Sequence, residues 1–233
     1  HLYDPHTPYA PPEPFRSEYG SSSMAQLYDG EIAFMDSQIG RCLEWLNKRG
    51  LRNKTIVAMM ADHGEGLGDH GEMTHGYFIY DYAVHVPFIL SVPDGKAQQV
   101  ASQVRTIDLY PTLLEASGIS IPKQVQGTSL WSLIDHGGGD FFAYSESMAP
   151  SIQYGWSPLL SLRTPKFKYI DAPRPEFYDL QNDPEEQTDL HEKEGKSASE
   201  YEKRLKTVVT ETSEGAPEVN AANLDSETIE RMA

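Results

Sequence analysis

The chain has 233 residues, of which 39% are hydrophobic, and it carries a formal net charge of −16. This length and composition predict a folded protein with a sizeable core and exclude a disordered tail. Nucleic acids and anionic membrane surfaces are bound mainly through Lys and Arg, so the charge argues against both as partners. No apolar run approaches the roughly 18 residues of a membrane span, and no membrane segment is expected.

The chain opens without an initiator Met and without a basic and apolar leader, so we expect further chain upstream. Its first 14 residues are rich in proline, which removes backbone donors and fixes φ, and this predicts a loop. His6 lies between Pro5 and Pro8 in this loop. A loop histidine is more often a surface residue than a ligand, but the flanking prolines would stiffen its presentation.

A long amphipathic helix is predicted from Ser23 to Gly50, because apolar residues recur there at every third or fourth position. The single cysteine, Cys42, excludes an internal disulfide. It falls on the apolar face of this helix, and we expect it to be a small buried hydrophobic residue rather than a nucleophile.

The stretch Thr55–Pro93 is interpreted as the core of an active site. The apolar, β-branched run 55–61 predicts a strand buried on both faces of an α/β sheet, and the next strand, Val86–Val92, is expected to pair with it in parallel. The first strand ends at Asp62 and His63. Open α/β sheets bind ligands at the carboxyl ends of their strands, so these side chains are candidates for a site.

The tetrapeptide Asp-His-Gly-Glu occurs twice, at 62–65 and at 69–72. A charged pair at the end of a buried strand is costly unless it is coordinated or paired, so metal ligation is the favoured interpretation of the first copy and a structural ion pair the alternative. The second copy lies in a glycine-rich loop, where its charges are expected to be solvated. His75 follows as a further candidate, and His85 is a candidate ligand or a hydrogen-bonded residue at a helix end.

The rest of the chain predicts a helix within 104–118, a helical segment at 126–134 and short strands at 141–146, 157–162 and 167–170. A charged, exposed helix is expected over 197–212, followed by a loosely ordered tail. The predicted fold is therefore α/β, a mixed sheet with helices followed by a small antiparallel sheet and a helix. The expected divisions are 1–136, 137–192 and 193–233.

Taken together, the motifs resemble the sulfatases of the alkaline-phosphatase superfamily over nearly the whole chain. The segments that carry this resemblance, in chain order, are Asp4-Pro-His-Thr-Pro8, Ala61-Asp-His-Gly-Glu65, Gly68-Asp-His-Gly71, Thr74-His-Gly76, Val86-Pro87, Ile107-Asp-Leu-Tyr-Pro-Thr-Leu113, Gln126-Gly-Thr-Ser129 and Phe177-Tyr-Asp-Leu-Gln-Asn-Asp-Pro184. The resemblance implies an alkaline-phosphatase-like fold and a hydrolase of sulfate monoesters, arylsulfatase-like, acting on a sulfated small molecule or glycan.

The resemblance also implies roles for four residues. Asp62 and His63 would be two ligands of one divalent cation, usually calcium, and His6 and His75 would contact the sulfate and take part in catalysis. Calcium prefers oxygen ligands while imidazole suits zinc or manganese, so these two metals stay open. A periplasmic or secreted location is what the family favours.

Two features of the family pattern are absent from this sequence. These are the pair of aspartates that completes the metal site and the Cys-x-Pro-x-Arg segment whose cysteine or serine becomes the formylglycine nucleophile. Cys42 lies in Gly40-Arg-Cys-Leu-Glu44 and cannot be that nucleophile. We therefore expect a fragment that is inactive alone, with an exposed sheet edge that favours homo-oligomers.

Three functional classes stay open at this point. The first is a sulfatase. The second keeps the fold but changes the chemistry, as a phosphodiesterase, phosphonate hydrolase or phosphoethanolamine transferase. The third is a non-catalytic module that binds an anion or a partner. The upstream nucleophile segment would distinguish the first two, and the absence of both upstream aspartates would favour the third.

Overall fold

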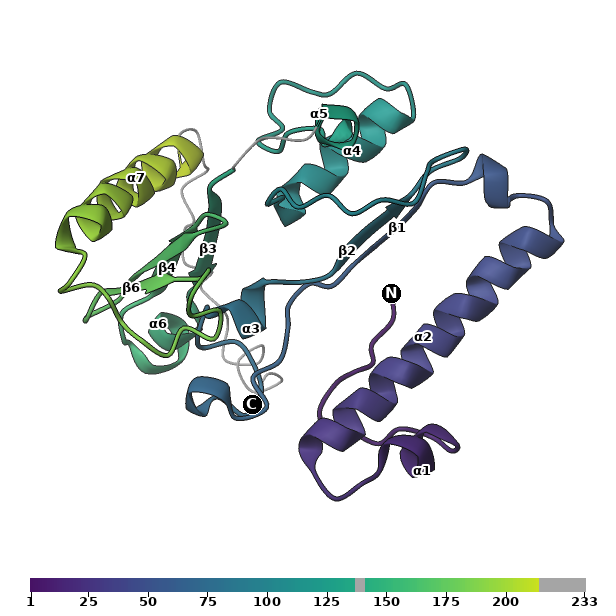
Figure 1. Cartoon of the computed structure of the whole chain (residues 1–233), viewed down its shortest axis with the longest axis horizontal. Coiled ribbons are helices and arrows are strands. Elements are labelled where there is room, and N and C mark those ends of the chain that lie inside the picture. Colours follow the sequence, from purple (N-terminus) through teal and green to yellow (C-terminus); the bar gives the residue numbers. More distant parts are fainter. Residues whose placement is uncertain (137–140, 214–233) are drawn as a thin grey trace, which may run out of the picture.

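The computed structural model describes residues 1–136 and 141–213 and has a mixed architecture of helices and sheets (Figure 1). The first part of the chain contains α1 (Phe15–Tyr19), α2 (Met24–Lys48), β1 (Val57–Met60), α3 (Asp81–Val84), β2 (Phe88–Ser91), α4 (Leu109–Ala116) and α5 (Trp131–His136). The second part contains β3 (Ala143–Ser147), α6 (Ala149–Tyr154), β4 (Leu159–Arg163), β5 (Phe167–Asp171), β6 (Glu176–Asp179) and α7 (Gly195–Ser213). Short 3-10 helices lie at Arg52–Lys54, Asp69–Gly71 and Thr106–Asp108.

The predicted long helix is confirmed as α2. The side chain of Ser23 caps it by accepting a hydrogen bond from the backbone N–H of Gln26, at 3.2 Å. The proline-rich N-terminal loop packs against the first half of α2, where a Cβ on Gly30 would lie 2.9 Å from Cγ of Pro11. Because this loop covers only that half, Cys42 is exposed, and the prediction that it is buried was wrong.

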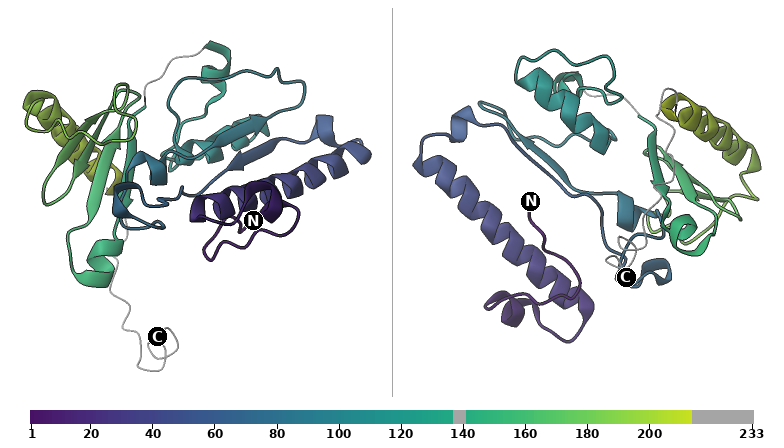
Figure 2. Two further views of the ribbon diagram at one scale, coloured as in Figure 1. Left: turned by 60° about the horizontal axis from the view of Figure 1, so that its bottom comes forward. Right: turned by 180° about the vertical axis from the view of Figure 1, so that it is seen from behind.

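The strand at 55–61 is confirmed in part. β1 and β2 form a two-stranded ribbon and pair antiparallel, with Met60 opposite Phe88, so the predicted parallel pairing was wrong. The connection leaves the C-terminal end of β1 and enters β2 at the same end of the ribbon, so the two strands run in opposite directions. A parallel pair would need a connection that crosses back to the start of β1. β1 is also half-buried throughout rather than buried on both faces. Helix α2 runs in nearly the same direction as this ribbon (Figures 1 and 2).

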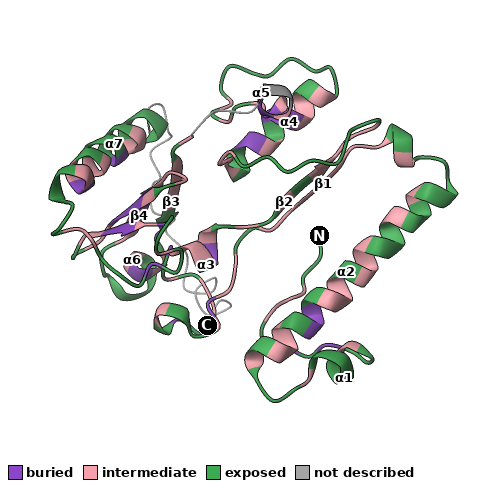
Figure 3. Cartoon of the chain, in the orientation of Figure 1, coloured by how far each residue is buried: buried purple, intermediate pink, exposed green. Residues whose placement is uncertain are grey.

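The predicted C-terminal antiparallel sheet is confirmed, with the order β3-β4-β5-β6. Side chains alternate between its faces, as the strand period requires. Tyr169 and Phe177 face α7 and form one core with Leu205, while Ile170 and Tyr178 face the other way. The views agree that α7 covers one side of this sheet, and both β4 and α7 carry buried residues (Figures 2 and 3).

Three element predictions need correction. Residues 176–179, for which no strand was predicted, form the fourth strand of the sheet. The helical segment expected at 126–134 begins only at Trp131. The residues before it donate their backbone N–H groups to side chains instead of to helical carbonyls. The N–H of Thr128 donates to the carboxylate of Asp108 at 2.8 Å, and that of Leu130 donates to the hydroxyl of Thr112 at 3.0 Å. The charged C-terminal helix buries Ala198 and Leu205 rather than lying fully exposed.

The expected division at residue 137 lies outside the described residues, and so does the predicted tail beyond residue 213. The division into three parts stays a prediction. Within residues 1–136 and 141–213, none of the helices is long and apolar enough to cross a membrane.

The core under α7 gives a first testable prediction. Replacing Leu205 by Ala removes a fully buried side chain and should lower the free energy of unfolding by about 2–5 kcal/mol. Lys203→Ala on the exposed side of the same helix is the control and should change it by less than about 0.5 kcal/mol. Chemical denaturation of both variants measures this, and equal losses in the two would show that α7 does not pack as described.

Candidate active site

The loop that follows β1 is held against α3 by its backbone. The N–H of Gly64 donates to the carbonyl of Ala83 at 2.8 Å, and the N–H of Gly66 donates to that of Thr74 at 2.7 Å. A Cβ at Gly64 would lie 1.9 Å from the carbonyl oxygen of Tyr82, so only glycine allows this approach. The loop therefore presents Asp62 and His63 in a fixed place.

Asp62 and His63 lie together at the surface. The side chains are 81% and 43% exposed, respectively, and the nearest carboxylate oxygen of Asp62 lies 3.8 Å from Nε2 of His63. Nδ1 of His63 donates to the carbonyl of Gly64 at 2.9 Å, which leaves the Nε2 lone pair available as a ligand. The expectation that this pair is buried was wrong. Because both side chains are exposed, an ion from solvent can reach the carboxylate oxygen and Nε2.

The donor set fits a divalent cation, though incompletely. One carboxylate and one neutral imidazole are usual ligands of zinc, manganese and related ions. Within the described part of the chain, no group of three or more His, Cys, Asp or Glu side chains could hold a metal. If they bound an ion, Asp62 and His63 would supply only part of its coordination shell.

His75 is positioned by a buried carboxylate. Its Nδ1 lies 3.2 Å from Oε1 of Glu65, whose side chain is only 5% exposed. The other oxygen of Glu65 accepts a hydrogen bond from the hydroxyl of Tyr9 at 2.5 Å. Burial and the bond to Glu65 raise the pKa of Tyr9 to about 12, so this hydroxyl remains a donor at neutral pH. Glu65 thereby links the N-terminal loop to the imidazole.

A second buried carboxylate fixes His6. Glu31 on α2 accepts hydrogen bonds from the backbone N–H of His6 at 3.0 Å and of Ala10 at 2.6 Å. The ring of His6 stacks on Tyr3, with centroids 4.4 Å apart, and the Tyr3 hydroxyl lies 3.2 Å from its Nε2. The proline-rich loop is thus tied to the first half of α2, which it covers.

The structure brings the predicted residues together. The rings of His63 and His75 have centroids 3.8 Å apart, and those of His75 and His6 are 6.2 Å apart. With Asp62 beside His63, all four candidates converge from the N-terminal loop and the loop after β1. Sequence reasoning missed the contributions of Tyr3, Tyr9 and Glu31. The one available signal was Glu31, a charged residue on the apolar stripe of α2, three positions after Tyr28.

The second Asp-His-Gly-Glu copy is structural, and the expectation that its charges are solvated was wrong for Glu72. That carboxylate is buried and accepts hydrogen bonds from the N–H of Tyr77 at 2.8 Å and the hydroxyl of Tyr82 at 2.6 Å. His70 stacks on Tyr80 with centroids 3.7 Å apart. Its Nε2 lies 2.9 Å from the carbonyl oxygen of Glu185, in the C-terminal part of the chain.

His85 lies at the C-terminal end of α3, as its helix-end interpretation predicted. Its backbone N–H donates to the carbonyl of Asp81 at 2.9 Å, and its Nδ1 lies 3.9 Å from the carboxylate of Asp81. His85 is therefore the C-cap residue of α3.

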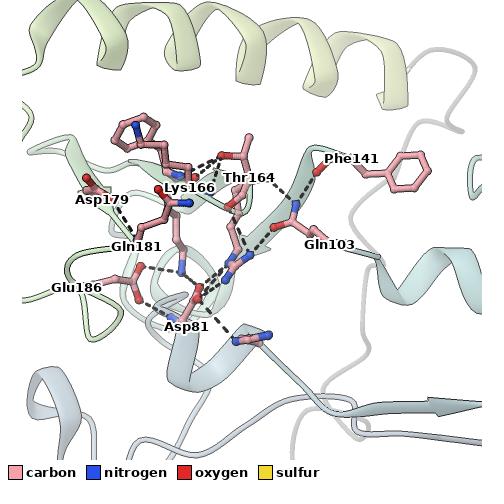
Figure 4. Close-up of polar contacts among 12 residues, drawn as sticks. Asp81, Gln103, Phe141, Thr164, Lys166, Asp179, Gln181 and Glu186 are labelled. Atoms are coloured by element: carbon pink, nitrogen blue, oxygen red, sulfur yellow. Dashed lines mark hydrogen bonds and ion pairs between the residues drawn. The ribbon is translucent and has the colours of Figure 1, made fainter. Parts of the chain in front are cut away.

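Asp81, at the start of α3, joins the loop of the candidate site to the C-terminal sheet (Figure 4). Its carboxylate accepts hydrogen bonds from Nη2 of Arg163 at 2.7 Å and from Nζ of Lys168 at 3.0 Å. Lys168 is fully buried and also lies 2.9 Å from Oε1 of Glu186. The other oxygen of Glu186 accepts the backbone N–H of Asp81 at 2.5 Å. Nη1 of Arg163 also donates to Gln103.

The charges of this cluster act in opposite directions on its two acids. Burial alone would raise the pKa of Asp81, but the hydrogen bonds of Arg163 and the charge of Lys168 outweigh it and lower that pKa. Burial raises the pKa of Glu186, and Lys168 offsets this only in part. Lys168 is therefore shared between two carboxylates, of which Asp81 is the more firmly ionised.

Residues 1–119 match the sulfatase family, and residues 68–214 match the family described as N-sulphoglucosamine sulphohydrolase, C-terminal. The first match alone spans more than half of the chain. The fold and the histidine cluster described above fit this assignment, and the chain belongs to the sulfatase family.

Two curated relatives show the same relationship. Arylsulfatase K of Mus musculus is 29% identical over 221 residues, which cover 85% of this chain and 40% of that protein. An arylsulfatase of Clostridium perfringens is 33% identical over 186 residues, which cover 76% of this chain and 37% of that protein. The chain thus spans about two fifths of the length of these relatives.

Solved structures confirm the alkaline-phosphatase-like fold. A putative sulfatase from Bacteroides fragilis superposes with a TM-score of 0.78 at 24% identity, covering 91% of this chain and 53% of that one. A protein in complex with its substrate D-glucosamine-2-N,6-O-disulfate gives 0.68 at 25% identity, covering 85% and 42%. A phosphonate monoester hydrolase of Agrobacterium radiobacter gives 0.70 at 24%, covering 81% and 42%, so the fold alone does not fix the chemistry.

The Asp81 cluster gives a second prediction. Asp81→Asn keeps the shape of the side chain but leaves Arg163 and Lys168 without its charge, and should lower the free energy of unfolding by about 3–5 kcal/mol at neutral pH. Asp94→Asn, at an exposed turn, is the control and should cost less than about 0.5 kcal/mol.

The pH dependence of this loss follows from the lowered pKa of Asp81. Its contribution is complete above the ordinary value of 3.8 and is lost as the pH falls through the lower folded-state value. The difference in stability between the parent protein and Asp81→Asn should therefore be constant near neutral pH and shrink below about pH 3.8. Urea unfolding across this range measures it, and a difference that grew on acidification would contradict the charge pairing.

Proposed function

We propose that this chain is the C-terminal part of a sulfuric ester hydrolase that acts on sulfate monoesters with a divalent metal. The observation that carries the proposal is the convergence of Asp62, His63, His75 and His6 from two separate loops. Membership of the sulfatase family supports the same reaction. A cluster of imidazoles beside a carboxylate suits the binding of a cation and of the anionic group that it attracts.

Asp62 and His63 would hold the metal. The carboxylate oxygen and the Nε2 lone pair are the free donor atoms of this pair, and they lie 3.8 Å apart. Calcium is proposed because the chain resembles family members that use it, although the imidazole also suits zinc or manganese. When bound, the cation would neutralise negative charge on the sulfate oxygens.

His6 and His75 would contact the sulfate directly. When protonated, an imidazole donates hydrogen bonds to sulfate oxygens, and it can pass its proton to the oxygen of the departing alcohol as the sulfur–oxygen bond breaks. Glu65 holds His75 through Nδ1, which leaves Nε2 for the substrate. His6 keeps Nδ1 on the carbonyl of Thr7, at 2.7 Å, and presents Nε2 next to the hydroxyl of Tyr3.

We further propose that the nucleophile and the remaining metal ligands come from chain outside this sequence. The chain matches only about two fifths of each curated relative reported above. In addition, α2 buries only Gly30 and Glu31 along its 25 residues, and the β1–β2 ribbon is half-exposed. These uncovered faces support the presence of further protein in the complete enzyme.

The substrate is proposed to be a sulfated sugar or glycan. The protein solved with D-glucosamine-2-N,6-O-disulfate shares the fold at 25% identity, and a curated relative from Bacteroides thetaiotaomicron, 28% identical over 78% of this chain, is named N-acetylglucosamine-6-O-sulfatase. The phosphodiester and phosphonate alternatives keep the same fold. Assays of the full-length protein with 4-nitrophenyl sulfate and bis(4-nitrophenyl) phosphate separate them, and a preference for the phosphodiester would overturn the proposal.

A third prediction concerns the metal ligand. In the full-length enzyme, Asp62→Asn keeps the shape but removes a charged donor, and should weaken metal affinity and lower kcat/KM by about 10- to 100-fold or more. Asp69→Asn, the equivalent change in the second Asp-His-Gly-Glu copy, is the control and should leave both near the parent values. Calorimetric calcium titration and 4-nitrophenyl sulfate turnover measure them. Parent-like activity of Asp62→Asn would remove Asp62 from the site.

A fourth prediction concerns residues 1–233 alone. They should neither hydrolyse 4-nitrophenyl sulfate nor bind calcium with submicromolar affinity. Calcium takes about six to eight oxygen ligands, and Asp62 and His63 supply only two side chains. Without a nucleophile, the covalent step cannot proceed. Turnover above buffer, or submicromolar calcium binding by titration calorimetry, would show that the nucleophile or the metal site is misplaced.

A further inference from the structure

Aromatic side chains, one half-buried and two exposed, gather directly after the candidate sulfate-binding residue His75. Tyr77 lies two positions further along the chain, so its Cα is within about 7 Å of that of His75. Its ring centroid lies 5.9 Å from that of Tyr154, which lies 4.8 Å from that of Trp156. Tyr154 is 54% exposed and Trp156 is 66% exposed. We call these three residues, Tyr77, Tyr154 and Trp156, the aromatic platform.

The platform is fixed to the loop of the candidate site. The hydroxyl of Ser147, at the end of β3, donates to the carbonyl of Gly76 at 2.8 Å, and thus ties the start of α6 to the residue after His75. The C-terminal end of α6 holds the other two rings. Gly155 there adopts a φ of 67°, and the N–H of Trp156 donates back to the carbonyl of Pro150 at 3.1 Å. The rings therefore keep their position relative to the site.

The edge of the platform is polar. The hydroxyl of Tyr77 lies 2.8 Å from the side-chain oxygen of Gln153 and 3.1 Å from the hydroxyl of Tyr154. The hydrogen bond with Tyr154 raises the pKa of Tyr77, so the Tyr77 hydroxyl stays protonated at neutral pH. Flat apolar rings bordered by hydroxyls and an amide can pack against the C–H face of a pyranose while they bond its hydroxyl groups.

We propose that the aromatic platform binds a sugar ring of the substrate next to the ring whose sulfate is cleaved. This inference rests on the proposed function, because the position of the cleaved sulfate is taken to be at His75 and His6. The platform then makes the enzyme selective for oligosaccharides over small aryl sulfates, since only a substrate longer than one ring reaches both places.

The chemistry of the surroundings favours a sugar over other ligands of aromatic rings. Nucleic-acid bases also stack on Tyr and Trp, but they come with a phosphate backbone that a chain of net charge −16 repels. A protein partner or another part of the same enzyme would bury these rings, and the test below separates this case by its effect on stability.

The test uses the full-length enzyme and a hexasaccharide of N-acetylglucosamine that carries a single 6-O-sulfate, so that the charge of the probe is small. Trp156→Ala should weaken hexasaccharide binding, measured by titration calorimetry, by about tenfold, the effect of losing one aromatic contact. Trp156→Phe should keep most of the affinity. Tyr110→Ala, at an exposed aromatic residue on α4, is the control and should bind like the parent. kcat/KM for 4-nitrophenyl sulfate should be the same in all four proteins.

Three results would overturn the platform. The first is the absence of hexasaccharide binding by the parent. The second is an unchanged affinity in Trp156→Ala with unchanged thermal stability, and the third is an unchanged affinity with lowered thermal stability, which would mean that the ring packs inside the enzyme. Loss of 4-nitrophenyl sulfate turnover in the parent would count against the proposed function alone. Binding that depends on Trp156 would still establish the platform in that case.

Discussion

The ion pairs of Asp81 with Lys168 and Arg163 are the interaction on which the candidate site depends most. Asp81 begins α3, and α3 supplies the backbone carbonyl that receives the N–H of Gly64 beside His63. The partners of Asp81 come from β4 and β5 of the C-terminal sheet. A buried lysine without its carboxylates would be strongly destabilising, so the loop and the sheet must be placed together for either to be stable. The sheet thus acts as a base for the loop that carries Asp62, His63 and His75.

Two further buried carboxylates hold the histidines of the candidate site in place. Glu31 holds the backbone of the His6 loop, and Glu65 holds both His75 and the hydroxyl of Tyr9. Among the described residues, neither is paired with Lys or Arg. Their charge is met by hydrogen-bond donors instead, which satisfies a buried carboxylate and also fixes the groups that donate. In a chain of net charge −16, capture of an anion must be local, and the proposed metal ligands and the imidazoles are gathered at one point for it.

The sequence was informative where local pattern decides structure. Helix α2 and three of the four strands of the C-terminal sheet follow from periodicity, turn residues and caps, and the convergence of His6, Asp62, His63 and His75 follows from the family resemblance. Pairing direction is not a local property, and β1 and β2 proved antiparallel. The burial of the two Asp-His-Gly-Glu copies was not predicted correctly either, since Glu72 is buried and accepts hydrogen bonds from Tyr77 and from Tyr82 of α3, while Asp62 is exposed. The burial of Lys168 could not be predicted from the sequence. A charged residue in a short strand is expected to face solvent, and the two carboxylates that pair with Lys168 lie on other parts of the chain.

The measurement that tests the account most directly is anomalous diffraction from crystals of the full-length protein grown with Mn²⁺ in place of calcium. The account predicts a metal peak in contact with the carboxylate of Asp62 and Nε2 of His63, on the side where His75 and His6 lie. Ligand distances should be about 2.0–2.6 Å, the range of oxygen and nitrogen ligands in such sites. A metal peak at Asp69 and His70, with none at Asp62, would contradict the assignment of the site.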